Sequence, residues 1–360
     1  MKRALLVLLL VVSCSHSSPK AAPTPSATPS PTASPTAAPT VDPSPHETTP
    51  PPAGPVGPVG TKVPKGFVPQ SATFISDSTG WVLGYSPCPS GKGRCDVIAR
   101  TRDAGRTWKA IPSPRTSPDK LAQIRFADAR NGFVSGDDLW TSHDGGASWK
   151  IVPNEDGTGL AISGGRAWYA VDSHVFSAPV TGGEFDQEQG DHMNSLALHG
   201  SLVVTNDFAT GARLQVLHHG EEPHSVAAPC AEMDTPAVGL GSTTHWFLVC
   251  QGDAGLGHQE KTAYQSFDAG AHWKAVGQPP SLTGTDIYVT GDGTFVFDHQ
   301  EVSVYRDQVW RTVLTSGGGV GDGGFESARL GFCIGVFDDS GDGSMMMTHD
   351  AGRTWKPVAF

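Results

Sequence analysis

The sequence predicts an all-β fold, a single seven-bladed β-propeller of four-stranded blades, and two observations carry this prediction. One motif, Ser/Thr-x-Asp-x-Gly-x-x-Trp, occurs four times, and its Asp residues are successively 41, 124 and 82 residues apart. These intervals are one, three and two steps of a single period of about 41 residues, which is the usual length of a four-stranded blade. Seven such periods fill residues 66–360.

The four complete copies of the motif are each followed by Lys, and their shared positions are Asp103, Gly105 and Trp108; Asp144, Gly146 and Trp149; Asp268, Gly270 and Trp273; and Asp350, Gly352 and Trp355. The period places three degenerate copies near positions 185, 227 and 309. At the last of these, Tyr305-Arg306-Asp307-Gln308-Val309-Trp310 keeps the Asp and the Trp.

The chemistry of the motif favours a structural role at the hairpin between the third and fourth strands of a blade. An Asp side chain can accept backbone N–H groups of a turn, and Gly provides a positive φ. The Trp is expected to be buried between sheets, and the Lys after it protects an exposed edge strand. We therefore expect no catalytic role for these residues.

A second pattern has the same period. Phe74 lies six residues before Gly80-Trp81, Phe126 six before Gly132-Phe133, and Phe325 six before Gly331-Phe332. Each is interpreted as an innermost strand, a tight turn and the start of a second strand.

The first motif resembles the Asp-box, or BNR repeat, of sialidases, sortilin-like receptors and photosystem II assembly-factor-like propellers. The pairing of both patterns is similar to the last of these families and spans nearly all of residues 66–360. The resemblance implies a propeller, and for the assembly-factor-like family it implies a non-enzymatic chaperone or scaffold. It does not imply photosynthesis, because the shared residues are those of the blade.

The N-terminus predicts a lipid-anchored, exported protein. Lys2 and Arg3 precede nine apolar residues, which are too few to span a bilayer. Val11-Val12-Ser13-Cys14 then resembles the lipobox of bacterial lipoproteins, which implies a signal peptide at 1–13 and acylation of Cys14 (palmitate among the acyl chains). Residues 14–65 are rich in Pro, Ser, Thr and Ala and are expected to form a disordered linker. The propeller at 66–360 should therefore lie at the extracytoplasmic face of the cell membrane.

Charge limits the class of partner. The formal net charge is −11, and the expected removal of Lys2 and Arg3 makes the remaining chain more acidic. We expect no nucleic-acid partner, because phosphate groups would be repelled. A monomer is expected, with the membrane contacted through the N-terminal lipid.

Cysteine positions predict two disulfides in an exported protein. Cys88 and Cys95 flank one hairpin loop, and Cys230 and Cys250 should meet on the loop face of the fifth blade. Cys333 lies in an apolar strand and is expected to be free.

Three loops between second and third strands are expected to be long, at 86–94, 251–261 and 337–344. In the last, Asp338, Ser340 and Asp342 have the spacing of the first half of a calcium loop, although His349 stands where Glu is usual, and an acidic hairpin loop is the alternative. His218, His219 and His224 could bind zinc or be solvated, and the glycine-rich run 317–324 is interpreted as a connection between blades. No other cofactor is expected.

These observations favour a non-enzymatic, lipid-anchored surface propeller that binds a protein or glycan. The alternative is a glycoside hydrolase, sialidase-like or another exo-glycosidase, with its active site on the loop face. Against a sialidase, the chain has no Arg-Ile-Pro motif. Separated catalytic carboxylates would leave no local motif, so the alternative stays open.

Overall fold

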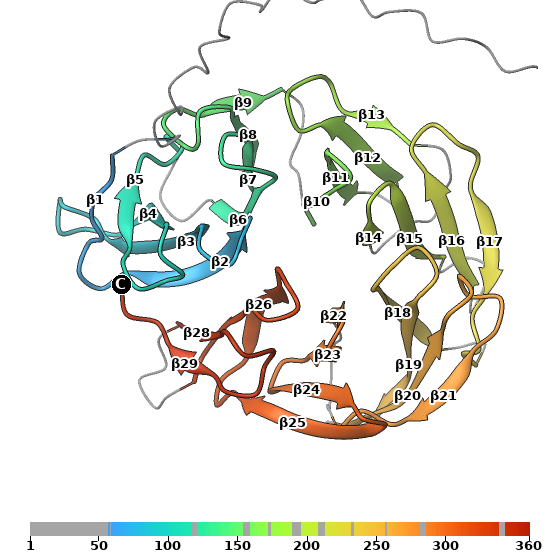
Figure 1. The fold of residues 1–360 in the computed structure, drawn as a ribbon. Helices are drawn as coiled ribbons and strands as arrows, with labels where there is room; N and C mark the ends of the chain where they lie inside the picture. Colours follow the sequence, from blue (N-terminus) through green and yellow to red (C-terminus); the bar gives the residue numbers. More distant parts are fainter. Residues whose placement is uncertain are drawn as a thin grey trace, which may run out of the picture. The chain divides into compact units, whose positions relative to one another are not determined.

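The computed structural model describes residues 57, 59–116, 121–153, 159–171, 174–188, 196–207, 213–231, 234–255, 258–280, 286–337 and 343–360. Every regular element in these ranges is a β-strand. The described residues contain no helix long and apolar enough to cross a membrane. The strands form seven antiparallel sheets arranged as a ring, which confirms the predicted seven-bladed propeller (Figure 1).

Four strands build each blade, and they are hydrogen-bonded in chain order from the channel outward. The first four blades comprise β2 (Val68–Phe74), β3 (Gly80–Pro87), β4 (Arg94–Thr101) and β5 (Lys109–Ile111); β6 (Leu121–Phe126), β7 (Gly132–Gly136), β8 (Leu139–Ser142) and β9 (Lys150–Val152); β10 (Ala161–Ser163), β11 (Arg166–Val171), β12 (His174–Pro179) and β13 (Asp186–Gln187); and β14 (Ala197–His199), β15 (Leu202–Asp207), β16 (Arg213–His218) and β17 (His224–Ala227).

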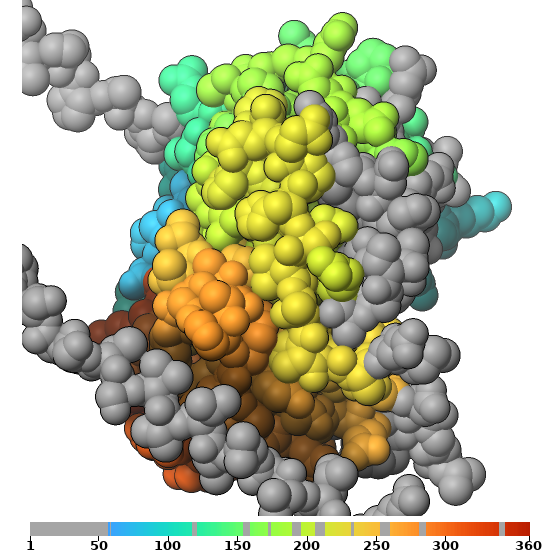
Figure 2. Space-filling model, turned by 90° about the vertical axis from the view of Figure 1, so that its right-hand side faces the viewer, coloured from blue at the N-terminus to red at the C-terminus, as the bar shows by residue number. Residues whose placement is uncertain are grey.

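The last three blades comprise β18 (Thr235–Leu240), β19 (Trp246–Gly255), β20 (His258–Ser266) and β21 (Lys274–Gly277); β22 (Asp286–Thr290), β23 (Gly293–Phe297), β24 (Glu301–Arg306) and β25 (Val309–Thr315); and β26 (Val320–Phe325), β27 (Gly331–Gly335), β28 (Ser344–Thr348) and β29 (Lys356–Pro357). From the side, blades 3, 4 and 5 follow one another along the ring, in green, yellow and orange (Figure 2).

Blade 1 differs from the prediction, because it has a fifth strand. β1 (Thr61–Lys62) pairs with β5 on the outer edge, so strand structure begins upstream of the predicted start at Gly66. The pairing gives β5 a partner on its outer side, which an outermost strand otherwise lacks.

The first and last blades close the ring through side chains rather than through a shared strand. Phe74 of β2 packs against Phe332 of β27 with 5.9 Å between ring centroids, and Phe67 contacts Phe360 at 4.7 Å. A hydrogen bond from the Ala72 N–H to Asp322 Oδ2, 3.0 Å long, joins β2 to β26.

Each Phe of the second sequence pattern pairs directly with its Gly across the first hairpin of the blade, as Phe74 does with Gly80. A Cβ on Gly80 would lie only 2.3 Å from the Phe74 ring, so Gly is required for the ring to lie over the neighbouring strand.

The motif turns lie between the third and fourth strands, where the sequence predicts them. At Asp350, the Thr354 N–H donates to Oδ1 at 2.8 Å, the Thr354 hydroxyl donates to Oδ2 at 2.7 Å, and the Thr348 hydroxyl donates to Oδ1 at 2.8 Å. The Gly352 N–H donates to the Thr348 hydroxyl, and Gly352 has a φ of +71°. Equivalent bonds surround Asp103, Asp144 and Asp268.

All four motif Trp rings pack against core residues, but they are buried to different degrees. Trp108 is buried, whereas Trp149, Trp273 and Trp355 are half-buried. Each of the three residues directly precedes the outermost strand of its blade, β9, β21 or β29. Trp108 is covered in addition by Phe360, 5.1 Å away between centroids.

Two of these rings tie adjacent blades together. The indole N–H of Trp149 donates to the carbonyl of Pro112 at 2.9 Å, and that of Trp273 donates to Ala227 at 3.2 Å, in each case reaching the outer edge of the preceding blade. Trp310, in the degenerate sixth copy, donates in the same way to Val276 at 3.0 Å.

Two predicted loops are strands instead. The run 317–324 contributes only its first three glycines to a blade connection, because Val320–Phe325 is β26. A Cβ on Gly323 would lie 2.6 Å from the Phe297 ring, so these glycines make room for aromatic rings. Most of the predicted loop at 251–261 belongs to β19 and β20.

Candidate functional site: the central channel

The seven innermost strands surround a central cavity of about 880 Å³. Because successive innermost strands run in the same direction, the motif turns lie at one end of this channel. The long loops between second and third strands lie at the other end. Backbone bonds agree with this arrangement: the Ala351 N–H of a motif turn donates to Arg329, in the first hairpin turn of the same blade, at 3.0 Å.

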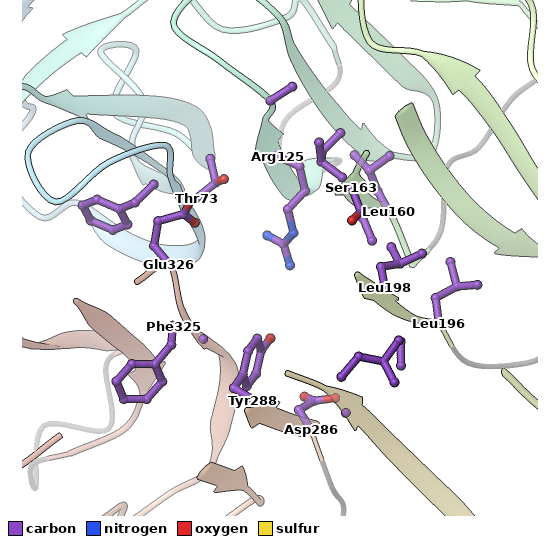
Figure 3. Close-up of a pocket in the computed structure, with 18 of the residues that line it drawn as sticks. Thr73, Arg125, Leu160, Ser163, Leu196, Leu198, Asp286, Tyr288, Phe325 and Glu326 are labelled. Carbon is purple, nitrogen blue, oxygen red and sulfur yellow. The ribbon is translucent and has the colours of Figure 1, made fainter. Parts of the chain in front are cut away.

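The wall of the channel has two chemically different halves (Figure 3). Blades 3, 4 and 5 contribute aliphatic side chains, namely Leu160, Ile162, Leu196, Leu198, Val238 and Leu240. Blades 1, 2, 6 and 7 contribute most of the polar groups, among them Thr73, Arg125, Asp286, Tyr288 and Glu326, and Ser163 of blade 3 adds a hydroxyl.

Arg125 and Asp322 form an ion pair that holds three blades together. Their closest atoms, Nη2 and Oδ1, are 3.3 Å apart. Arg125 Nη1 also donates to the Ser71 hydroxyl at 2.9 Å and to the carbonyl of Ala72 at 3.1 Å. Asp322 accepts further bonds from the N–H groups of Ala72 and Gly323, both at 3.0 Å. Both charged groups are therefore well bonded within the fold.

Asp286 and Tyr288 lie on the same side of β22, two residues apart, and face the channel (Figure 3). Solvent in the channel reaches Asp286, yet the surrounding protein and the charge of Asp322 raise the pKa of its carboxyl, while Arg125 and His299 act in the opposite direction. Burial, followed by the charge of Asp286, raises the pKa of Tyr288, so this hydroxyl keeps its proton at neutral pH.

Glu326 lies at the end of the channel next to the motif turns. The side chain is exposed to solvent, yet desolvation by the surrounding protein, with a smaller contribution from Asp77, raises the pKa of Glu326 to about 7. Part of the Glu326 population is consequently protonated near neutral pH.

The motif residues lie around the rim of the propeller rather than in the channel wall. Their Asp carboxylates are occupied by turn hydrogen bonds, which lower the pKa of Asp350 to about 2 against the opposing effect of burial. Sequence reasoning missed the seventh position of each motif, whose side chains supply a second bond to the Asp: Thr107, Ser148, His272 and Thr354. A hydroxyl or imidazole there is the signal that could have found them.

Both predicted disulfides are present, Cys88–Cys95 and Cys230–Cys250, with Cα atoms 5.0 and 5.3 Å apart. Cys333 is free and buried in β27, as expected.

The candidate calcium ligands Asp338, Ser340 and Asp342 lie outside the described residues, as does Cys14. Within the described ranges no three His, Cys, Asp or Glu side chains gather as a metal site would require. Of the histidines considered for zinc, His219 instead bonds Glu188 through Nδ1 at 2.8 Å.

Glu188 lies between a serine and a histidine without forming a nucleophilic triad. Its Oε1 accepts the Ser177 hydroxyl and also contacts His219, so the carboxylate, not the imidazole, is next to the serine. In a triad the imidazole must take the hydroxyl proton. The arrangement instead joins blade 3 to blade 4, which has no motif Trp.

Sequence reasoning missed the channel residues because no local motif contains them. Arg125 and Asp322 are 197 residues apart and meet only because the ring closes. One signal was available: charged residues within innermost strands, just before Phe126 and Phe325, are unusual for a buried strand.

No protein-family model and no curated protein matches the chain. Among solved structures, YCF48 bound to a D1 peptide superposes with a TM-score of 0.55 at 16% identity and covers 83% of this chain and 98% of its own. The β-propeller domain of the Trilobed protease from Pyrococcus furiosus gives 0.55 at 6% identity, covering 82% and 96%. Virginiamycin B lyase from Staphylococcus aureus gives 0.53 at 10% identity, covering 78% and 94%.

These similarities place the chain in the class of β-propellers. Identities this low show the shared fold alone, and the fold carries many unrelated functions.

Proposed function

We propose that this protein is a non-enzymatic binding scaffold, anchored by a lipid on Cys14 at the extracytoplasmic face of the cell membrane. Its propeller holds a protein or glycan ligand in the central channel. The motif turns are proposed to be Asp-boxes that serve the scaffold only.

The observation that carries the proposal is the division of the channel wall. A concave surface that combines apolar side chains with a few fixed polar groups is a usual composition of a binding site. A ligand that covers partly exposed leucines such as Leu198 would gain binding free energy of about 25 cal/mol per Å² of apolar surface buried. YCF48, a propeller of similar fold, has been solved with a peptide bound. That is a property of YCF48, but it supports testing a peptide ligand here.

Site-specific photo-crosslinking in the intact cell envelope tests this function. A benzoylphenylalanine replaces Leu198 in the channel wall, and as a control it replaces Ile151, which is 48% exposed on the outer strand β9. We expect a crosslinked product from the channel position alone, identified by mass spectrometry. Equal products from both positions, or none from Leu198, would contradict the proposal.

The glycoside hydrolase alternative is tested on the same protein. Release of reducing sugar from a panel of neutral and sialylated glycans is measured for the wild type and for Asp286→Asn and Glu326→Gln. These are carboxylates of the channel wall. Hydrolysis that either substitution abolishes would replace the scaffold proposal with the enzymatic one.

A further inference from the structure

The channel contains one carboxylate that the fold does not use. Asp322 is bonded by Arg125 and by two backbone N–H groups. The carboxylate of Asp286, in contrast, makes no hydrogen bond or ion pair with any residue that the structure describes, and it is open to the channel. The carboxylate is exposed to solvent in the channel, so it is free to pair with a ligand there.

A second polar group faces the same space. The Tyr288 hydroxyl also has no hydrogen-bond partner among the described residues, although the ring is held firmly. Phe297 packs edge-on against it with 5.3 Å between centroids, and Gly324 leaves room for it, since a Cβ there would lie 3.0 Å from the ring. An acceptor and a hydroxyl are thus fixed two residues apart on one strand, aimed into one cavity (Figure 3).

The charged side chains around Asp286 and Tyr288 favour a positively charged ligand. Asp286, Asp322 and Glu326 lie around the polar half of the channel, and Arg125 is the cation that faces them within the described strands. Arg125 is already used by Asp322, so an anion would find no free positive partner, whereas a cation would find Asp286. The net charge of −11 also favours the approach of cations.

The aliphatic wall of blades 3 and 4 indicates which kind of molecule carries the positive charge. Leu160, Leu196 and Leu198 of blades 3 and 4 present aliphatic surface to the same channel (Figure 3). A compact hydrated metal ion would gain nothing from this wall, whereas a methylene stem would bury apolar surface against it.

We propose that the central channel binds a primary ammonium or guanidinium group on an aliphatic stem, paired with Asp286, hydrogen-bonded to the Tyr288 hydroxyl oxygen and covered by the leucines of blades 3 and 4. This inference rests on the proposed function and specifies its ligand. The group could belong to a Lys or Arg side chain of a protein partner or to a free polyamine, and the two sources share this chemistry.

Calorimetric titration of the full-length protein in detergent micelles tests the inference. The probes are acetyl-Ala-Lys-Ala-amide, the same peptide with norleucine in place of lysine, spermidine, and calcium chloride. We expect the lysine peptide or spermidine to bind at least roughly tenfold more tightly than the norleucine peptide, because only a charged group pairs with Asp286. Binding by the peptide alone indicates a protein source, and binding by spermidine alone indicates a polyamine.

Two variants and one control locate the site. Asp286→Asn should weaken binding roughly tenfold or more, and Tyr288→Phe should weaken it by a smaller factor. Asp186→Asn removes the same charge from the exposed outer strand β13 and should leave binding unchanged. Thermal melts of all three variants establish that each is folded.

Several results would overturn the inference: no binding by either cation at millimolar concentration, equal binding of the norleucine peptide, unchanged binding to Asp286→Asn, or a preference for calcium. Failure here is distinguishable from failure of the proposed function. If photo-crosslinking at Leu198 still captures a ligand while Asp286→Asn has no effect, the scaffold stands and the cation assignment falls.

Discussion

The indole of Trp81 lies flat on the ring of Phe126, with 3.8 Å between their centroids and 3° between their planes. The two residues belong to different blades: Trp81 is the second residue of β3 in blade 1, and Phe126 ends β6 of blade 2. Phe332 of blade 7 packs on Phe74 of blade 1 at the corresponding positions. The pattern Phe-x5-Gly-aromatic therefore does two things. Its Gly admits the Phe of its own blade, and in blades 1 and 7 its second aromatic packs on the corresponding Phe of the next blade.

Removing this contact should destabilise the whole ring. Trp81 is fully buried, so Trp81→Ala should lower the free energy of unfolding by about 3–5 kcal/mol, the range for deletion of a buried aromatic. Chemical denaturation followed by far-UV circular dichroism measures it. Val309→Ala, at an exposed position of β25, is the control and should change stability by less than about 0.5 kcal/mol. A Trp81→Ala protein as stable as the control would show that the stack contributes nothing.

The inter-blade indole bonds allow a matched comparison. Trp149→Phe keeps an aromatic ring and removes the donation to Pro112, which should cost about 0.5–1.5 kcal/mol. Trp355 occupies the same motif position in blade 7, but its buried indole nitrogen has no partner among the described residues. Trp355→Phe should therefore be neutral or slightly stabilising, because it removes an unsatisfied donor.

Thermal and denaturant unfolding of the two Trp→Phe variants, measured side by side, decides this point. Both substitutions lose similar ring area, so the difference between them isolates the hydrogen bond. Equal losses of unfolding free energy in the two variants would mean that the hydrogen bond of Trp149 adds no stability and that packing alone explains the Trp of the motif.

Local patterns predicted the scaffold because a propeller repeats short-range chemistry. The turn at Asp350 is built from residues 348–354, and the first hairpin from residues six apart, so both leave a motif in the sequence. The Cys88–Cys95 disulfide could be predicted for the same reason, since the two residues flank one hairpin loop. Blade number followed from the period alone.

The channel could not be predicted in this way, because it is made by the closure of the ring. Arg125 and Asp322 come from blades 2 and 7, and neither has a neighbour in sequence that indicates its partner. The glycine run misled for a related reason: Gly323 and Gly324 look like a flexible connection, but they leave space for Phe297 and Tyr288 of the preceding blade. Inter-blade packing of that kind has no fixed sequence offset.

The motif carboxylates should make stability depend on pH in the acid range. Burial acts to raise the pKa of Asp350, but hydrogen bonds from Thr354 and Thr348 outweigh it and lower the pKa to about 2, against about 4 in an unfolded chain. A folded-state pKa below the unfolded value adds stability that is fully present above about pH 4 and is lost as the pH falls towards 2.

The difference in melting temperature between wild type and Asp350→Asn tests this. We expect the wild type to melt higher than the variant at pH 6, and the gap to narrow steadily between about pH 4 and pH 2. Thr354→Val, which keeps the charge but removes one hydrogen bond, should lie between them. If the difference in melting temperature persists at pH 2, the Asn side chain destabilises the turn for a reason other than its lack of charge.

Thiol counting can test the disulfide assignment and the acylation of Cys14 in one measurement. The chain has six cysteines, of which four form the two disulfides. Cys333 is fully buried, and burial, with a smaller contribution from Asp322, raises the pKa of its thiol, so the native protein should not react with a disulfide reagent at pH 8. After denaturation without reductant, Cys333 should give one equivalent, because a thioether-linked lipid blocks Cys14. Cys333→Ala should then give none. Two equivalents from the wild type would show that Cys14 is unmodified, and rapid reaction of the native protein would show that Cys333 is accessible.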